Sequence, residues 1–249
     1  MTWISLHLML LAAPQSADEE KTVAAWVEQL DAEEAGSRES AEKRLRRLKA
    51  SWVPFLRKAQ AAGKSQETKA RLSQIVSQLL IEEGNSLYAE GHLPEALAKL
   101  AEGANAENPK DYVEKKIKQA RDHLKEAMPP GKECAYDLVA SEMKLYGLWA
   151  MPPLIELLGN QGAEQETPSA FVLQKMGSDA IPALCWAMGS KNPRLRENAA
   201  NVLGSIRQNS KLAVESLLRA YRNPDEIDAV RNRARDSLIR ITGAEPAEK

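Results

Sequence analysis

The sequence predicts an all-α protein, a right-handed α-solenoid of helix pairs, and three observations support this prediction. Aromatic residues make up only 5% of the chain, whereas Ala, Leu, Glu, Lys and Arg are abundant. Such residues lose little rotamer freedom in a helix and therefore favour helices. Related motifs recur at intervals of 30 and 33 residues, which suits one helix pair per repeat. Within the motifs, apolar residues follow the three- and four-residue spacing of a helix face.

The first seventeen residues have no charged side chain and contain an apolar run from Trp3 to Ala13. This run is too short for an ordinary transmembrane helix but fits the hydrophobic region of a signal peptide. We therefore expect residues 1–17 to be a signal peptide that is cleaved near Ala17, which would place the mature chain in the periplasm or outside the cell. The alternatives are an uncleaved membrane anchor or a mis-assigned start codon. We expect no transmembrane helix beyond this segment.

Three later stretches align without gaps, and a fourth matches them at its Pro and Leu positions. They are AMPPLIELLGN from Ala150, AIPALCWAMGS from Ala180, AVESLLRAYRN from Ala213 and WVPFLRKAQ from Trp52. Pro in the first helical turn is favourable because its missing N–H would have no partner there. The aligned leucines are predicted to point inward: Leu56, Leu154, Leu184 and Leu217.

A second set of helices is predicted from RESAEKRLRRL at Arg38, RENAANVLGSI at Arg196 and RNRARDSLIRI at Arg231. In each of them an Ala, a Leu and a second aliphatic residue fall on one face. The small Ala permits a neighbouring helix to approach closely, and the larger side chains fill the layer between helices. Turn residues in GSKNP and RNPDE separate two of these helices from their neighbours.

This alternation of R-x-x-A-x-x-x-L-x-x-I and A-I-P-A-L helices resembles the HEAT family. The resemblance covers residues 133–243 well and residues 22–80 more loosely. Glu166 and Ser169 depart from the motif, so we expect the repeat of residues 166–190 to pack less regularly. The resemblance implies that the aligned arginines pair with carboxylates or carbonyls in adjoining turns; a stripe for an acidic ligand is the alternative. These arginines are Arg38, Arg196 and Arg231.

The middle of the chain differs, because GNSLYAEGHLPEALAKLAEGANAENP from Gly84 resembles a single tetratricopeptide repeat. One such motif cannot form the groove that several would make. The predicted organisation is therefore a signal peptide at 1–17, a HEAT-like segment at 18–80, a tetratricopeptide-like hairpin with a charged helix at 81–127, a hinge at 128–132, HEAT-like repeats at 133–243 and a disordered tail at 244–249.

No catalytic, metal or cofactor motif is present in the sequence. His92 and His123 lie in polar surroundings and are predicted to face solvent. Cys134 and Cys185 belong to no C-x-x-C pair, and whether they pair with each other stays open. HEAT-like folds also occur in enzymes that attach bilins or excise alkylated bases, so a bilin-lyase-like enzyme remains an alternative. We expect a non-enzymatic protein without cofactors or metals.

The charge pattern leaves one further alternative. The net charge is −1, but residues 37–76 carry eleven Lys or Arg against three Glu. This segment could bind an anionic polymer or surface, whose phosphates would make binding strongly salt-dependent. In this alternative, the cations that bind the ligand are Arg38, Lys43, Arg44, Arg46, Arg47, Lys49, Arg57 and Lys58. Because a solenoid exposes a long curved surface, we favour a scaffold that binds a protein or peptide ligand. We do not expect nucleic acid to be the ligand.

Trp186 is the principal predicted binding residue, and Glu156 and Arg219 are predicted to belong to the same binding surface. It aligns with Glu156, Arg219 and Lys58, so three of the four repeats have a charged side chain at this position. A repeated charge indicates exposure because burying an unpaired charge is costly. An exposed tryptophan is a common interface hot spot. The alternative is a rotated helix that packs Trp186 into the core beside Met176 or Met188.

Overall fold

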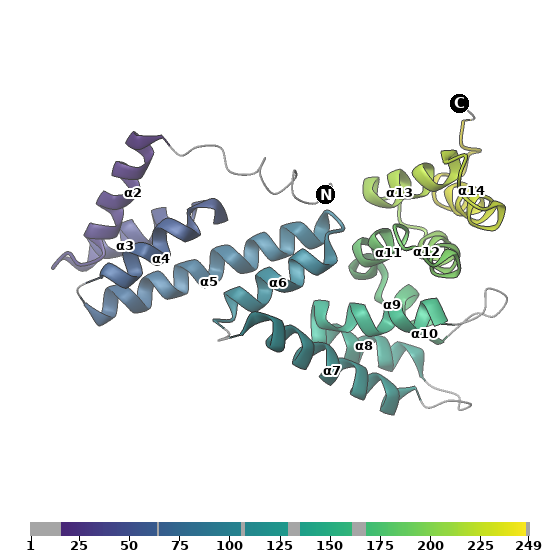
Figure 1. Cartoon of the computed structure of the whole chain (residues 1–249), viewed down its shortest axis with the longest axis horizontal. Coiled ribbons are helices and arrows are strands. Elements are labelled where there is room, and N and C mark those ends of the chain that lie inside the picture. Colours follow the sequence, from purple (N-terminus) through teal and green to yellow (C-terminus); the bar gives the residue numbers. More distant parts are fainter. Residues whose placement is uncertain (1–15, 64, 106–107, 129–134, 161–167, 248–249) are drawn as a thin grey trace. The chain divides into compact units, whose positions relative to one another are not determined.

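The computed structural model describes residues 16–63, 65–105, 108–128, 135–160 and 168–247. It confirms the all-α prediction, since every regular element in these residues is an α-helix or a short 3-10 helix (Figure 1). The handedness of the solenoid stays a prediction. The elements are α2 (Ala17–Gln29), α3 (Ala35–Leu45), η1 (Ala50–Trp52), α4 (Val53–Ala62), α5 (Gln66–Ala89), α6 (Leu93–Gly103), α7 (Pro109–Ala127), α8 (Tyr136–Tyr146), η2 (Gly147–Ala150), α9 (Met151–Asn160), α10 (Pro168–Met176), η3 (Gly177–Ala180), α11 (Ile181–Ala187), α12 (Pro193–Ile206), α13 (Lys211–Arg222) and α14 (Asp228–Thr242).

The helices belong to two compact units, each with its own apolar core. Unit 1 comprises Met1–Asn85 and Lys99–Glu107, and unit 2 comprises Ser86–Ala98 and Asn108–Lys249. The core of unit 1 includes Leu30, Leu45, Leu56, Leu72, Ile75 and Leu79. The core of unit 2 includes Leu93, Leu124, Met143, Leu154, Leu184, Leu203, Leu217 and Leu238.

The segment boundaries of the structure differ from those expected from the sequence. The expected boundary between residues 80 and 81 falls within α5, a single helix of 24 residues. The expected hinge begins at Met128, directly after α7, and its residues 129–132 lie outside the described part of the chain. α7 buries Ala120 and Leu124 in the same core as α8 and α9, so the segments on both sides of this connection belong to unit 2.

Unit 2 contains stacked helix pairs in two rows (Figure 1). The first helices of the pairs are α8, α10, α12 and α14, and each packs against the next along the chain. The second helices are α9, α11 and α13, and α11 packs against both of the others. Side chains of α12 also join consecutive repeats, because Asn198 Nδ2 donates to Leu158 O at the end of α9 over 2.9 Å. This arrangement is the predicted repeat of helix pairs.

The aligned positions Ala150 and Ala180 have the same structural role in two consecutive repeats. Ala150 and Ala180 each end a 3-10 turn that leads into a second helix, and both are fully buried. Each turn begins with a glycine of positive φ, 57° at Gly147 and 65° at Gly177, a conformation that side chains with a Cβ disfavour. The repeat of residues 166–190 has the shortest helices among the pairs of unit 2, with 9 residues in α10 and 7 in α11. It buries Ser169 at the position where the motif has Ala.

Only part of each end of the chain lies within the described residues. Residues 1–15, and with them most of the predicted signal peptide, lie outside the described residues, whereas Ser16 is the N-cap of α2 and forms a capping box with Glu19. Of the predicted tail, residues 244–247 are described, and Glu245 accepts two hydrogen bonds from Arg235.

Among the described helices, none combines the length and apolar character needed to cross a membrane.

Candidate functional site

The repeated position on the second helices is exposed in unit 2. Glu156 on α9, Trp186 on α11 and Arg219 on α13 are all exposed, and Trp186 leaves 42% of its surface accessible. Lys58 occupies the equivalent exposed position on α4 of unit 1. Met176 and Met188 are buried while the tryptophan is not, so the structure places the ring outside the core.

The residue before Trp186 shows how α11 separates its buried and exposed faces. Cys185 is a buried free thiol that leaves 9% of its surface accessible. Burial raises its pKa to about 11, although a hydrogen bond with Ser216 and the charge of Arg219 act in the opposite direction. The thiol is therefore protonated at neutral pH and is a poor nucleophile. Cys134 lies outside the described residues.

The α13 side of Trp186 carries unpaired positive charge. Arg219 lies near enough to α11 for its charge to act on the Cys185 thiol. Arg219 and Arg222 form the basic last turn of α13, and both are exposed. Neither forms an ion pair with any other described residue, whereas the acid one turn earlier, Glu215, pairs with Lys211 over 3.8 Å.

The α9 side of Trp186 is electrically balanced. Glu156 Oε2 accepts a hydrogen bond from Arg121 Nη2 over 2.7 Å, which joins α9 to α7. Both side chains are more than one-third exposed, so the ion pair contributes little to stability. Its effect on the surface is to neutralise Glu156.

Residues 86–98 contact the beginnings of α11 and α13 within unit 2. Tyr88 Oη donates a hydrogen bond to the carbonyl of Asp179, just before α11. Gly91 has φ +87°, and a Cβ there would lie 3.7 Å from the Pro182 carbonyl oxygen and 3.8 Å from a methyl group of Leu212. Because Pro182 precedes Trp186 by one helical turn, this contact covers the start of α11 and leaves the turn with Trp186 exposed.

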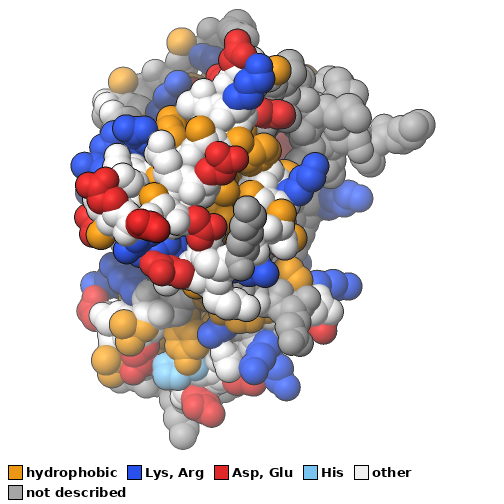
Figure 2. Space-filling view, turned by 90° about the vertical axis from the view of Figure 1, so that its left-hand side faces the viewer, with side chains coloured by type: hydrophobic (Ala, Val, Ile, Leu, Met, Phe, Trp, Pro, Cys, Tyr) orange, Lys and Arg blue, Asp and Glu red, His pale blue; other side chains and the backbone are white. Residues whose placement is uncertain are grey.

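The basic segment of unit 1 is only partly available to a ligand. Arg46 Nη2 donates to Glu42 Oε1 over 2.6 Å, and Arg38 binds backbone carbonyls. The remaining six predicted cations are exposed and form no ion pair with a described residue: Lys43, Arg44, Arg47, Lys49, Arg57 and Lys58. Figure 2 views the molecule from the side of α2–α4, and acidic, basic and hydrophobic side chains are interspersed on this face. This mixture does not favour a dedicated surface for an anionic polymer.

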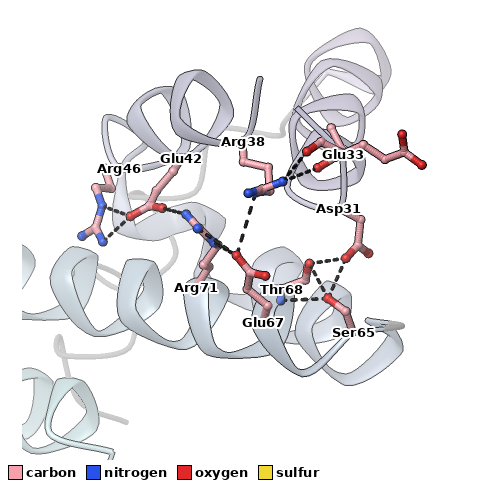
Figure 3. Close-up of polar contacts among 10 residues, drawn as sticks. Asp31, Glu33, Arg38, Glu42, Arg46, Ser65, Glu67, Thr68 and Arg71 are labelled. Atoms are coloured by element: carbon pink, nitrogen blue, oxygen red, sulfur yellow. Dashed lines mark hydrogen bonds and ion pairs between the residues drawn. The ribbon is translucent and has the colours of Figure 1, made fainter. Parts of the chain in front are cut away.

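The repeat arginines contact neighbouring turns. Arg38 Nη1 donates to the carbonyls of Ala32 and Glu33, both over 2.8 Å, and its Nε lies 3.8 Å from Glu67 (Figure 3). Arg196 Nη1 donates to the Ser190 carbonyl over 2.7 Å. In both cases the carbonyl precedes the arginine by six residues, so the guanidinium closes the turn that leads into its own helix.

The other contacts of these arginines are carboxylates. Arg196 binds Glu226 through two hydrogen bonds of 2.8 and 2.5 Å, and Arg231 pairs with Asp228. Burial raises the pKa of Glu226, but the hydrogen bonds from Arg196 and from the Ile227 N–H, together with the charges of Arg196 and Arg231, outweigh this effect and leave the pKa below its usual value of 4.5. In unit 1, hydrogen bonds from Arg46 and Arg71 lower the pKa of Glu42 in the same way (Figure 3). All three repeat arginines therefore have partners within the chain, as the structural interpretation expects.

The described residues contain no group of three His, Cys, Asp or Glu side chains that could hold a metal ion. His92 is exposed as expected, whereas His123 is half-buried between α7 and α8. Its Nε2 lies 3.1 Å from Glu142 Oε2, and its ring packs on Tyr146. The spacing of residues in the sequence did not predict this contact, because α7 is not part of the repeat motif.

The comparison with protein families agrees with the helix pairs of unit 2. The family described as HEAT repeats matches residues 151–239, from the start of α9 into α14. Among solved structures, the designed armadillo repeat protein YIII(Dq)4CqI is similar over 88% of this chain and 100% of its own, with 15% sequence identity and a TM-score of 0.26. Comparison with curated proteins finds no match.

Proposed function

Because residues 151–239 match the family described as HEAT repeats, we propose that this chain is a non-enzymatic scaffold that binds a protein segment across α9, α11 and α13. A helical-repeat stack exposes an extended surface built from equivalent positions, which suits recognition of an extended ligand. Trp186 is the anchor of the proposed surface. The buried thiol of Cys185 is protonated at neutral pH and gives no support to the alternative of an enzyme.

The exposed ring of Trp186 is the observation that carries this proposal. Its 42% exposure occurs at a position where the neighbouring repeats have Glu156 and Arg219. Removing the ring from water on binding would contribute a large apolar area, which explains why tryptophan is enriched among interface hot spots. The same exposure predicts that the ring contributes less to folding than the fully buried leucines of the core.

Affinity purification tests the proposal. The full chain is isolated from the cells that produce it, and co-purifying proteins are identified by mass spectrometry. Trp186→Ala should reduce recovery of the bound protein at least tenfold, in keeping with a hot-spot loss of about 2 kcal/mol or more. The melting temperature should fall by less than in a core variant such as Leu203→Ala, because 42% of the Trp186 surface is already accessible to water.

Leu138→Ala is the matched control. Leu138 is also an exposed apolar residue of unit 2, 59% accessible, but it lies on the first helix α8. This variant should retain the bound protein. Equal losses in the two variants, or a large drop in stability for Trp186→Ala, would contradict the proposal.

We also propose that the chain is exported. The support is the apolar run from Trp3 to Ala13, followed by small residues and the acidic start of α2. Cleavage after Ala17 would remove the Ser16 cap of α2, and loss of such a cap costs about 0.5–2 kcal/mol. Cleavage before Ser16 would retain it. Sequencing of the mature N-terminus distinguishes these two sites.

A further inference from the structure

The exposed part of the second helices in unit 2 is a short strip with charge at one end. We define the open strip as Glu156, Trp186, Arg219 and Arg222. Residues 86–98 contact the beginnings of α11 and α13, and the strip begins at Trp186, about one turn after Pro182, and at Arg219, about two turns after Leu212. Glu156 is neutralised by Arg121, whereas the two arginines of α13 have no ionic partner among the described residues.

The spacing of packed helices limits the length of a ligand on this strip. Neighbouring helices pack about 8–10 Å apart, so three second helices in a row span about 16–20 Å between the outer axes. An extended chain advances about 3.3 Å per residue, and about six residues cover this distance. One step between neighbouring helices, from Trp186 to Arg219, corresponds to about three residues of ligand.

The charge of the strip indicates which ligand side chains fit beside Trp186 and beside Arg219. An apolar side chain can pack on the Trp186 ring, and an acidic side chain facing Arg219 and Arg222 can form charge-assisted hydrogen bonds. A basic ligand would meet uncompensated like charge at the α13 end. In nucleic acids phosphates recur at every nucleotide, but within the strip unpaired cations occur at the α13 end alone. A protein segment with acid at one end therefore fits better than nucleic acid.

We propose that the open strip binds an extended acidic protein segment of about six residues, with an apolar side chain on Trp186 and a carboxylate about three residues away, facing Arg219 and Arg222. This inference rests on the proposed function and adds the chemistry and register of its ligand. Arg219 is the residue that selects the charge, and Trp186 is the residue that provides the apolar contact.

Selection from a phage-displayed library of random octapeptides tests the inference with the full chain as bait. Enriched peptides should combine an aromatic or aliphatic residue with Asp or Glu about two to four positions away. The best peptide is then synthesised with a fluorescein label, together with a version in which that acid is replaced by Lys, and affinities are measured by fluorescence anisotropy.

Charge reversal identifies the residue that faces the acid. Arg219→Glu should weaken binding of the acidic peptide at least tenfold. The same variant should bind the Lys version of the peptide more tightly than the parent chain does. Arg194→Glu is the matched control, because Arg194 is an exposed cation of α12 with no ion pair among the described residues. This control should change neither affinity by more than about twofold, since isolated surface charges separated from a site are screened.

The outcomes separate this inference from the proposed function. Enriched peptides that lack acids but still require Trp186 would overturn the acidic ligand and leave the scaffold function intact. Failure to enrich any peptide whose binding requires Trp186 would overturn both. Tighter, Arg219-dependent binding of a fluorescein-labelled twelve-nucleotide single-stranded DNA would replace the protein ligand by nucleic acid.

Discussion

The contact between α12 and α14 depends on a glycine, and substitution of Gly204 by Ala should destabilise unit 2. Gly204 is buried in α12 directly against Ser237 of α14. An added Cβ would lie 2.8 Å from the Ser237 Cβ and 2.9 Å from its Cα. Carbon atoms pack favourably at about 3.5–4.0 Å, so the two helices would have to separate by about 0.6–1.2 Å.

The expected magnitude follows from three opposing effects. Overpacking of a well-packed core costs about 1–3 kcal/mol. Displacing Ser237 also weakens its buried hydrogen bond to the Ala200 carbonyl, now 2.8 Å long and worth about 1 kcal/mol. Ala gains about 1 kcal/mol over Gly in helix propensity. The sum is a loss of about 2 kcal/mol, or about 4–8 °C in melting temperature for a chain of this size.

Calorimetry of the Gly204→Ala variant measures this loss, and Gly159→Ala provides the matched control. Gly159 is another buried helical glycine of unit 2, but a Cβ there would lie 3.4 Å from the Leu195 Cβ, an ordinary contact. This control should keep or slightly raise the melting temperature. A Gly204→Ala protein that is as stable as the parent would refute the close helix crossing.

Three further predictions address the core, an ion pair and export. Leu203→Ala and Leu238→Ala should each cost about 2–4 kcal/mol, because both leucines are almost fully buried; unchanged urea midpoints would contradict the assigned helix faces. Glu226→Gln should cost about 1.5–3 kcal/mol at pH 7 through weaker hydrogen bonds to Arg196. Because the pKa of Glu226 is lowered by folding, its stabilising effect is complete above pH 4.5 and is lost as pH falls through the folded-state value, so the parent and variant melting curves should converge in acid. Expressed with residues 1–17, the chain should be recovered outside the cytoplasm with Asp18 or a near neighbour as its N-terminus, whereas an intact Met1-containing chain in the cytoplasm would refute export.

The repeated part of the fold could be predicted from sequence because equivalent residues meet equivalent environments. The aligned Leu154, Leu184 and Leu217 are all fully buried, as their common position predicts. Charged residues aligned with Trp186 likewise predicted its exposure. In a stacked repeat each helix contacts its neighbours in the same register, so one alignment constrains many contacts.

The contacts of the non-repeated segments could not be predicted in this way. Tyr88 binds the carbonyl of Asp179, 91 positions later, and no periodic spacing connects the two residues. Arg121 neutralises Glu156 from α7, a helix outside the motif. These contacts decide which part of the second-helix row stays open and where its unpaired charge lies. They depend on tertiary packing, whereas the periodicity of a single helix specifies only its buried face.

Photo-crosslinking at position 186 tests the central claim most directly. The full chain is expressed in its native cells with benzoylphenylalanine in place of Trp186 and, in a separate variant, in place of Leu138 on the first helix α8. Both positions are exposed, so both photoreactive groups are accessible. We predict that irradiation of the first variant yields a covalent adduct with a protein partner and that the second yields none. An adduct from position 138 with none from position 186 would contradict the assignment of α9, α11 and α13 as the binding surface.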